Sequence, residues 1–510
     1  MLSTYPLICI SICESTWESV ARAMRDAGKH DCLIEIRLDC LTADALNNLD
    51  PLRALLAACL QPTVVTFRAA DEGGRCDADY ETRLRFWRDE GLELPAKFVD
   101  LELDIAKQLF REAGSVDWSR VICSYHNHGE VPADLNQIFE RLAATPARVL
   151  KVAVHVNDAV DCLQVFDLLE RAKRAGREII AIGMGAAGVA TRILGPARGA
   201  FFTYASLADR RATAAGQISI DELTSVYRVA AISSETVITG LVGRPVGHSI
   251  SPQIHNAAFA SSQTDAVYIP FEICNLKAFF KQMVHPRTRE IDWPLRGLSI
   301  TAPHKTEVLA ELDWIEVAAR EIGAVNTVVV EADRLCGYNT DASAFIAPLK
   351  NRLGPLNDAR VAIIGAGGAA SAALYSLKQE NARAIIFARD LHKAQQLADR
   401  CAIECRALEH ASFAEFDVVV NATPLGTSGE LENETPARAR QLRGARLAYE
   451  LVYNPPVTQF LREAQAASCE TLAGLPMLLA QAARQFELWT GGTANSAVMQ
   501  AAAIKALSQL

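Results

Sequence analysis

Short runs of apolar residues alternate with longer amphipathic, helix-like stretches through the first 230 residues of the chain. Each apolar run predicts a strand, and each stretch that follows predicts a helix. The runs recur roughly 20 to 35 residues apart, which is typical of βα units with parallel strands. The strands are predicted at 7–12, 33–38, 63–68, 98–103, 121–124, 149–154, 179–183 and 200–204. Eight parallel strands in about 220 residues predict a (β/α)₈ TIM barrel.

Polar side chains gather near the carboxyl ends of these predicted strands, where a barrel of this kind carries its active site. Lys151 stands out, because it lies within Val-Leu-Lys-Val-Ala-Val. A lysine among apolar neighbours on a central strand is costly unless it has a function, and such surroundings favour the neutral amine. The other polar residues near strand ends are Glu35, Arg37, Arg68, Glu102 and His126.

A different pattern begins after a predicted helix at 221–231 and a short polar linker, Ser233-Ser234-Glu235. Strands are predicted at 237–242, 266–270, 298–301 and 325–330. A further strand, at 359–364, leads directly into Gly365-Ala366-Gly367-Gly368-Ala369-Ala370 and an Ala-rich helix. This order fits the GxGxxA fingerprint, in which glycines let the backbone approach a dinucleotide pyrophosphate at a helix N-terminus.

The residues after the next predicted strand, 384–388, indicate which dinucleotide binds. An NAD enzyme usually carries Asp or Glu at this point, whereas this chain has Arg389, with Lys393 close behind. Arg389 could pair with a 2′-phosphate through two hydrogen bonds, which favours NADP(H). Asp390 leaves an alternative open, since its carboxylate could face the ribose.

Composition narrows the function classes. The net charge is −9, from 51 Lys and Arg against 60 Asp and Glu, which argues against a broad nucleic-acid-binding surface. No apolar run is long enough to span a bilayer. The 13 cysteines are scattered without a CxxC pair, so we expect small buried hydrophobes, a reducing cytoplasm and no metal site.

The first half resembles type I 3-dehydroquinate dehydratase. The resemblance rests on Glu35-Ile36-Arg37-Leu38-Asp39, Thr66 to Gly74, Ser124-Tyr125-His126-Asn127, Lys151-Val152-Ala153, Gly183-Met184-Gly185 with Thr191-Arg192, and Thr213 to Gln217. It implies that Lys151 forms a Schiff base, that His126 shuttles protons and that Glu72 orients His126. Arg192 would bind the substrate carboxylate. The remaining pocket residues implied are Glu35, Arg37, Arg68, Thr213 and Gln217.

The second half resembles shikimate dehydrogenase. The matching segments are Gly247 to Pro252, Thr301 to Lys305, Gly323 to Thr327, Asn339-Thr340-Asp341, the glycine loop, Asn421 to Gly426, Tyr453, and Gly474 through Gln481. Lys305 and Asp341 are implied as the pair that handles the hydroxyl proton, with either one as the donor. The implied substrate contacts are Ser249, Ser251, Thr301, Asn326, Tyr453 and Gln481. The implied cofactor contacts are Gly365, Ala366, Gly367, Gly368, Ala369, Arg389, Lys393, Thr423, Leu451 and Gly474.

The two resemblances together follow the order of the fused dehydratase–dehydrogenases of plants. They divide the chain into a barrel at 1–230, a linker at 231–236, a substrate-binding domain at 237–342, and a Rossmann NADP domain at 343–475. Helices from about 476 to 510 would complete the substrate-binding domain. The expected function is dehydration of 3-dehydroquinate followed by NADPH-dependent reduction of 3-dehydroshikimate to shikimate. The expected partners are these small molecules, without nucleic acid or membrane, and the sequence does not give the oligomeric state.

Two alternatives remain. The second half could oxidise quinate or shikimate catabolically, with NAD, although Arg389, Lys393 and the two serines argue against this. The chain could also be a metabolite sensor built from such domains. A sensor has no need for Lys151 and Lys305 together with their partner residues, so the sequence favours an enzyme.

Overall fold

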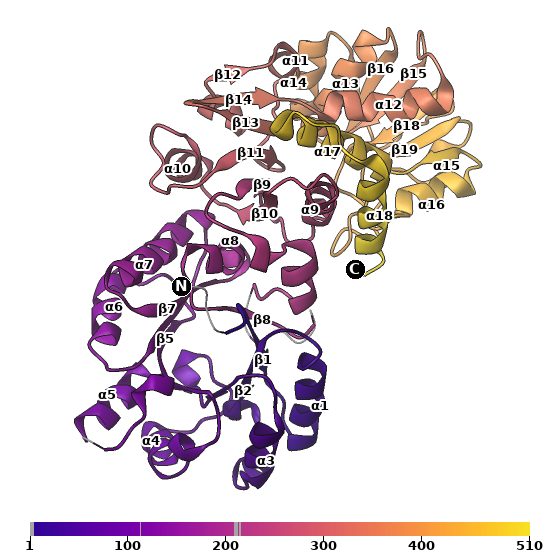
Figure 1. Cartoon of the computed structure of the whole chain (residues 1–510). Helices are drawn as coiled ribbons and strands as arrows, with labels where there is room; N and C mark the ends of the chain where they lie inside the picture. Colours follow the sequence, from indigo (N-terminus) through magenta and orange to yellow (C-terminus); the bar gives the residue numbers. More distant parts are fainter. Residues whose placement is uncertain (1–4, 113, 209–212, 214–215, 510) are drawn as a thin grey trace.

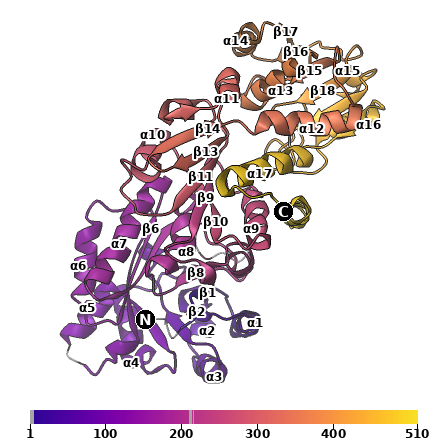
Figure 2. The same cartoon turned by 45° about the horizontal axis from the view of Figure 1, so that its top comes forward.

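The structure is a computed structural model that describes residues 5–112, 114–208, 213 and 216–509. It contains three sheets along the chain, and the middle sheet lies between the other two in both views of the molecule (Figures 1 and 2). The N-terminal barrel is coloured indigo to magenta, and the third sheet is orange to yellow (Figure 1). This arrangement matches the predicted fold class: a (β/α)₈ barrel followed by a two-domain α/β unit.

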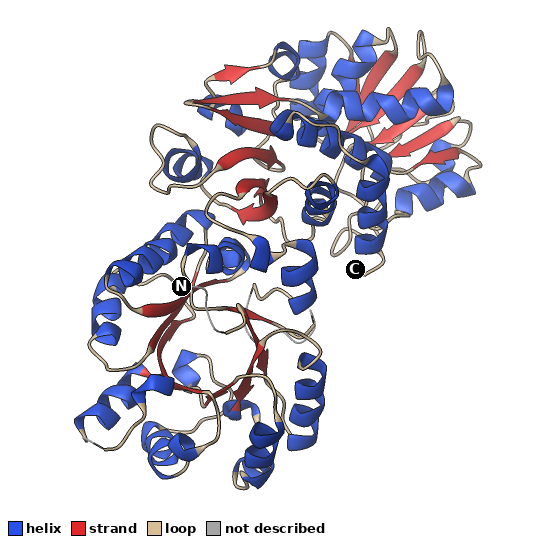
Figure 3. Cartoon of the chain, in the orientation of Figure 1, coloured by secondary structure: helices blue, strands red, loops and turns tan. Residues whose placement is uncertain are grey.

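The barrel is a ring of eight strands in the order β7-β6-β5-β4-β3-β2-β1-β8, with its helices on the outside (Figure 3). Its paired strands are parallel and almost fully buried, which explains why they read as continuous apolar runs. Their bounds are Ile8–Ile12 (β1), Leu33–Arg37 (β2), Thr63–Thr66 (β3), Phe98–Glu102 (β4), Val121–Asn127 (β5), Val149–His155 (β6), Glu178–Met184 (β7) and Thr203–Ala205 (β8).

The outer helices begin at recognisable caps. Thr16 accepts a hydrogen bond from the Ser19 backbone at the start of α1, and Asp79 does the same for Thr82 at α4. The main helices are Trp17–Ala27 (α1), Ala43–Leu46 (α2), Asp50–Ala58 (α3), Tyr80–Asp89 (α4), Leu103–Arg111 (α5), Leu135–Ala143 (α6), Cys162–Arg174 (α7) and Val189–Leu194 (α8).

Two sequence predictions for the end of the barrel need correction. The last strand begins at Thr203 instead of residue 200, and a single bridge between Ile179 and Ala200 closes the ring toward β7. The helix predicted at 221–231 is broken, because Arg228 adopts a left-handed backbone conformation with φ +52°. A π-helical turn precedes Arg228 and a short 3₁₀ turn follows it, so the chain bends before the linker.

The middle sheet has the order β10-β9-β11-β13-β14-β12, with β13 antiparallel to both neighbours. Its strands are Val237–Gly243 (β9), Ala266–Glu272 (β10), Leu295–Ile300 (β11), Trp314–Ile315 (β12), Thr327–Glu331 (β13) and Arg334–Tyr338 (β14). The sequence did not predict β12 and β14. The helices of this region are Ser251–Ser261 (α9), Leu276–Phe279 (α10) and Val317–Ile322 (α11), and α12 (Asp341–Leu353) leads to the third sheet.

The third sheet is parallel throughout, in the order β17-β16-β15-β18-β19-β20. Its strands are Arg360–Ile364 (β15), Arg383–Ala388 (β16), Glu404–Ala407 (β17), Val418–Asn421 (β18), Leu447–Glu450 (β19) and Glu470–Leu472 (β20). Its helices are Gly368–Gln379 (α13), Leu391–Cys401 (α14), Ala439–Leu442 (α15) and Gln459–Ala466 (α16). Because the strand order changes direction at β15, its carboxyl end lies beside the crevice where such sheets bind ligands.

The C-terminal helices α17 (Leu475–Thr490) and α18 (Ser496–Leu507) return to the middle sheet (Figure 1). Gln485 accepts a hydrogen bond from the Ser299 hydroxyl at 2.8 Å, and the Trp489 indole donates to the Val328 carbonyl at 3.1 Å. Both contacts tie α17 to strands β11 and β13. Helix α18 packs against α9. The last helices therefore pack against the middle sheet and its helix α9.

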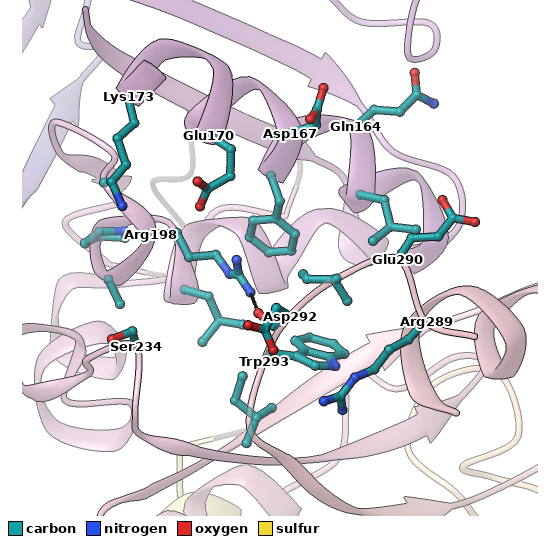
Figure 4. Close-up of a pocket in the computed structure, with 18 of the residues that line it drawn as sticks. Gln164, Asp167, Glu170, Lys173, Arg198, Ser234, Arg289, Glu290, Asp292 and Trp293 are labelled. Carbon is teal, nitrogen blue, oxygen red and sulfur yellow. Dashed lines mark hydrogen bonds between the residues drawn. The ribbon is translucent and has the colours of Figure 1, made fainter. Parts of the chain in front are cut away.

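Polar contacts join the barrel to the middle sheet. The Asp158 carboxylate accepts hydrogen bonds from the backbone of Cys274 at 2.8 Å and of Asn275 at 2.9 Å. Arg198 reaches across a cleft of about 1110 Å³ and donates to the Asp292 carbonyl (Figure 4). Asp158 follows β6 and Arg198 precedes β8, so the contacts with this region come from both ends of the barrel strands.

The structure departs from the expectation that the cysteines are only small hydrophobes. Cys13 and Cys40 form a disulfide that joins the end of β1 to the turn after β2. Cys9 and Cys123, by contrast, are fully buried free thiols. Among the described residues, no three His, Cys, Asp or Glu side chains are arranged to hold a metal, and no helix there is both long and apolar enough to cross a membrane.

Candidate active sites

The first candidate site is a pocket at the carboxyl ends of the barrel strands. All nine residues that the sequence placed in this site line it: Glu35, Arg37, Arg68, Glu72, His126, Lys151, Arg192, Thr213 and Gln217. They come from β2, β5, β6, α8 and the segments after β3 and β8, which are distant in sequence. The barrel geometry brings them together because its parallel strands all end on the same face.

Lys151 lies at the base of this pocket and is 4% exposed. Its Nζ donates to Asp100 Oδ2 at 2.8 Å and to the Tyr204 hydroxyl at 2.9 Å, and it lies 3.5 Å from Glu35 Oε1. The expectation of apolar surroundings is therefore wrong for the amine itself. The apolar residues of β6 surround the stem, whereas inward-facing polar groups from β2, β4 and β8 surround the nitrogen.

Asp100 is the carboxylate that the sequence analysis missed. It also accepts hydrogen bonds from Arg68 at 2.9 Å and from Ser124 at 2.6 Å. Burial alone would favour its neutral form, but the charges of Arg68 and Lys151 lower the pKa of Asp100 to about 2. Asp100 therefore stays ionised at neutral pH and holds the two cations in fixed positions.

His126 and Glu72 form a hydrogen-bonded pair above Lys151, with 3.0 Å between His126 Nδ1 and Glu72 Oε2. Burial and the positive charges of Arg68 and Lys151 hold the pKa of His126 well below its usual range. Burial raises the pKa of Glu72 to about 8, although the positive charge of Arg68, whose Nη1 lies 3.4 Å from Glu72 Oε2, acts in the opposite direction. The pair thus shares one proton near neutral pH, which suits a group that takes and returns protons. His128 also lines the pocket and contacts the Glu72 carbonyl at 3.0 Å.

The remaining residues form the walls. Arg192 is 1% exposed, and burial lowers the pKa of its guanidinium to about 10. The planar guanidinium is suited to a carboxylate ligand, which it can bind through two parallel hydrogen bonds. Thr213 and Gln217 hydrogen-bond each other, with 2.6 Å between the Thr213 backbone nitrogen and Gln217 Oε1. Arg37 is held by Asp39 through two hydrogen bonds of 2.7 and 2.8 Å.

The second candidate site is a cavity of about 480 Å³ between the middle sheet and the third sheet. Lys305 Nζ donates to Asp341 Oδ2 at 2.6 Å, and Asn326 donates to Asp341 Oδ1 at 2.7 Å. Lys305 follows β11 and Asp341 opens α12, so two different elements are required to make the pair. The amide of Asn326 fixes the orientation of the carboxylate, which leaves the ammonium facing the cavity.

Hydroxyls and amides line the rest of this cavity. The Ser249 hydroxyl donates a hydrogen bond to the Ser251 hydroxyl at 3.0 Å. Burial raises the pKa of the Tyr453 phenol, and the contact with Ser249 partly opposes this rise. The predicted contacts Ser249, Ser251, Thr301, Asn326, Tyr453 and Gln481 all line the cavity. The sequence analysis did not identify Ser299 and Gln485, which also line it. Such a lining offers many neutral hydrogen bonds, which suits a polyol.

A third cavity, of about 640 Å³, lies at the carboxyl end of β15. Six of the predicted cofactor contacts line it: Gly365, Ala366, Gly367, Arg389, Lys393 and Thr423. A side chain at Gly365, whose φ is +121°, would meet the Ala422 carbonyl at 2.9 Å, so only glycine fits there. Gly367 faces open space, which lets a ligand approach the backbone. Two basic side chains and exposed helix N–H groups fit a phosphorylated dinucleotide.

The Asp390 alternative loses support in the structure. Its carboxylate caps α14 by accepting hydrogen bonds from the backbone of His392 at 3.1 Å and of Lys393 at 3.2 Å. Arg389 and Lys393 line the third cavity as its two basic side chains, and Asp390 lines it as well.

Three of the other four predicted cofactor contacts lie at or beside the second cavity: Gly368, Ala369 and Leu451. Ala369 and Leu451 line the substrate-side cavity, and a Cβ at Gly368 would touch the Lys305 stem at 3.4 Å. Gly474 packs against the Leu451 and Val452 carbonyls and lines neither cavity. The start of α13 therefore places the dinucleotide cavity directly beside Lys305.

Comparison with known families assigns each part of the chain. The model of type I 3-dehydroquinase matches residues 8–234, and that of the shikimate dehydrogenase substrate binding domain matches 241–328. The model of shikimate / quinate 5-dehydrogenase matches 348–443, and that of the shikimate 5′-dehydrogenase C-terminal domain matches 474–504.

Individual relatives agree with these matches. A chloroplastic bifunctional 3-dehydroquinate dehydratase/shikimate dehydrogenase of Arabidopsis thaliana is 32% identical over 486 residues, covering 90% of this chain and 77% of the relative. An NADP⁺ shikimate dehydrogenase of Methanococcus aeolicus is 35% identical, covering 54% of this chain and all of the relative. A crystal structure of shikimate dehydrogenase in complex with NADP⁺ is similar with a TM-score of 0.50 and 34% identity, covering 54% of this chain and 97% of that one.

Proposed function

Because the chain belongs to the family of bifunctional 3-dehydroquinate dehydratase/shikimate dehydrogenases, we propose that the residues gathered in its two sites carry out these two reactions in sequence. The enzyme dehydrates 3-dehydroquinate to 3-dehydroshikimate and reduces that product to shikimate with NADPH. The observation that carries the residue assignments is that all nine predicted barrel residues line one pocket, with Lys151 at its base and the His126–Glu72 pair above it.

In the barrel, Lys151 is the nucleophile. Its nitrogen forms a bond to the ketone carbon of 3-dehydroquinate and water leaves, which makes a cationic imine that acidifies the neighbouring C–H. His126 takes that proton and returns it to the hydroxyl that departs as water, while Glu72 keeps the imidazole in place. Water then hydrolyses the imine and releases 3-dehydroshikimate. Arg192 binds the carboxylate throughout.

In the second site, Lys305 and Asp341 hold the ketone oxygen of 3-dehydroshikimate, and one of the two delivers a proton to it. When bound, NADPH supplies the hydride for the ketone carbon. Ser249 and Ser251 bind the carboxylate, and Tyr453 and the amides of the cavity bind the ring hydroxyls. Arg389 and Lys393 hold the 2′-phosphate, which selects NADP(H) over NAD(H).

We also propose the division of the chain given by the three sheets: a dehydratase barrel at 1–230, a substrate-binding domain at 237–342 with the C-terminal helices, and an NADP domain at 343–475. The ladders of each sheet fall within these bounds, which supports the division. A cytoplasmic location is proposed from the buried free thiols, and the Cys13–Cys40 disulfide is the observation against it. Fractionation of cells, with antibody detection of the chain, decides between the cytosol and an organelle.

Two single substitutions test the residue assignments together. We expect Lys151→Ala to abolish dehydration of 3-dehydroquinate while NADPH oxidation with supplied 3-dehydroshikimate continues. Lys305→Ala should do the reverse, with NADPH binding retained in a fluorescence titration. Loss of both activities in either variant would contradict two independent sites. A parent enzyme that binds these compounds without turnover would favour a metabolite sensor, and a preference for quinate with NAD⁺ would favour a catabolic enzyme.

A further inference from the structure

Tyr204, in the last barrel strand, extends its hydroxyl to the base of the dehydratase pocket. It is 6% exposed, and its ring packs edge-on against Phe202 with 5.4 Å between ring centroids. The hydroxyl accepts a hydrogen bond from Lys151 Nζ at 2.9 Å and donates one to Glu35 Oε1 at 3.2 Å. None of the catalytic roles described above uses this phenol.

The three polar neighbours of the Lys151 nitrogen are not equivalent. Asp100 is also held by Arg68 and Ser124, and Glu35 also accepts hydrogen bonds from Ser11 and Thr66. Both are carboxylates, so when ionised they can only accept hydrogen bonds. Tyr204 is the neutral neighbour. Burial and the charge of Glu35 raise the pKa of Tyr204 well above its usual range, so the phenol keeps its proton.

The Lys151 nitrogen changes its hydrogen-bonding needs during the reaction. As an ammonium it has three N–H donors, as a neutral amine it has two and a lone pair, and as a protonated imine it has one. A hydroxyl can accept from each N–H form and can turn to donate when the nitrogen exposes its lone pair. A carboxylate cannot make this change. Tyr204 is thus the neighbour whose chemistry can follow the nitrogen through every state.

We propose that Tyr204 is a positioning residue for Lys151: its hydroxyl holds the nitrogen in line with the substrate carbonyl while the imine forms and while it is hydrolysed. The inference rests on the proposed role of Lys151 as the nucleophile. Tyr204 transfers no net proton, and the bonds made and broken are those of imine formation. The ring fixes the direction of the hydroxyl because it is buried and packs edge-on against Phe202.

The test is Tyr204→Phe, which removes one oxygen and keeps the ring. We expect the rate at which borohydride traps the adduct between Lys151 and 3-dehydroquinate to fall about tenfold or more, which is the effect of losing a hydrogen bond to a charged group. The KM for 3-dehydroquinate should change much less than kcat, and the pH profile of trapping should shift. Dehydrogenase activity of the same preparation should be unchanged, which shows that the chain is folded.

A matched control is Tyr227→Phe, since Tyr227 is an equally buried tyrosine of the same half that does not line the pocket. It should leave the trapping rate unchanged. A Tyr204→Phe enzyme that forms the adduct as fast as the parent, with the same pH profile, would overturn the inference even if its thermal stability were lower. Equal slowing in both variants would also overturn it. Absence of any adduct in the parent would instead refute the role of Lys151.

Discussion

Replacing Asp100 with asparagine should weaken the barrel by an amount that the structure allows us to work out. Asp100 is 1% exposed and binds Lys151, Arg68 and Ser124. Its pKa falls from 3.8 to about 2 on folding, which corresponds to about 2 kcal/mol of folding free energy. Breaking a buried ion pair on one side costs about 3–5 kcal/mol, so together with the value from the pKa we expect a loss of about 2–5 kcal/mol at pH 7.

The sign of the pH dependence follows from the direction of this shift. Because the folded pKa is lower than the unfolded one, the contribution of Asp100 is fully present above about pH 4. It is lost as the pH falls through about 2. The difference in stability between the parent and Asp100→Asn should therefore be constant from pH 7 to pH 5. Loss of the same carboxylate should also reduce dehydratase turnover, since Lys151 and Arg68 lose their common anchor.

Hydrogen exchange followed by mass spectrometry measures this effect locally. Peptides from β4 and β5 report the opening of the barrel, and peptides from β15 and β18 serve as the internal reference in the same molecule. The matched control is Asp89→Asn, an exposed carboxylate of the same half, for which we expect a change within about 0.5 kcal/mol. Equal protection of the barrel peptides in the parent and Asp100→Asn would refute the electrostatic argument.

Three further predictions concern other parts of the molecule. Arg389→Ala should raise the KM for NADPH at least about tenfold and change the KM for NADH little, because a charge-assisted contact to the 2′-phosphate is lost. Equal effects on both cofactors in steady-state assays would show that Arg389 does not bind this phosphate. Reduction of the Cys13–Cys40 disulfide should lower the stability of the barrel by about 3–4 kcal/mol, because the disulfide closes a loop over a sequence separation of 27 residues and so lowers the entropy of the unfolded chain. The loss is measured as the shift in the urea midpoint with and without a dithiol. A Cys13→Ala variant that responds equally to the dithiol would contradict this prediction. Dehydratase kcat/KM should rise as the pH rises through about 8, where Glu72 loses the proton it shares with His126 and the imidazole becomes free to take the carbon-bound proton. Glu72→Gln should remove this limb from the pH profile, and an unchanged limb would assign it to another group.

The fold was largely predictable because buried parallel strands read as continuous apolar runs. Two of the strands that were not predicted lack this signal: β12 has two residues, and β17 is polar and partly exposed. Strands β18 and β19 were also not predicted, although both are buried, because each is only four residues long. The break at Arg228 was also hidden, because a left-handed arginine has no distinctive sequence pattern.

The candidate sites were predictable only where a polar residue stood out or a motif recurred. Asp100 lies two residues before Glu102 and therefore on the same face of β4, a signal that could have identified it. Tyr204 gave no such signal, since tyrosine is common in strands and its contact with Lys151 depends on closure of the ring. Asp390 was ambiguous because capping of a helix and binding of a ribose use the same residue types.

The most direct test of the account is mass spectrometry of the parent enzyme after incubation with 3-dehydroquinate and borohydride. The reductant converts an imine into a stable amine, so a lysine nucleophile keeps the substrate skeleton attached. We predict a single adduct that peptide mapping places on Lys151 and that is absent from Lys151→Ala. Dehydration that proceeds without an adduct, or an adduct on another lysine, would contradict the central claim that Lys151 is the nucleophile of the barrel site.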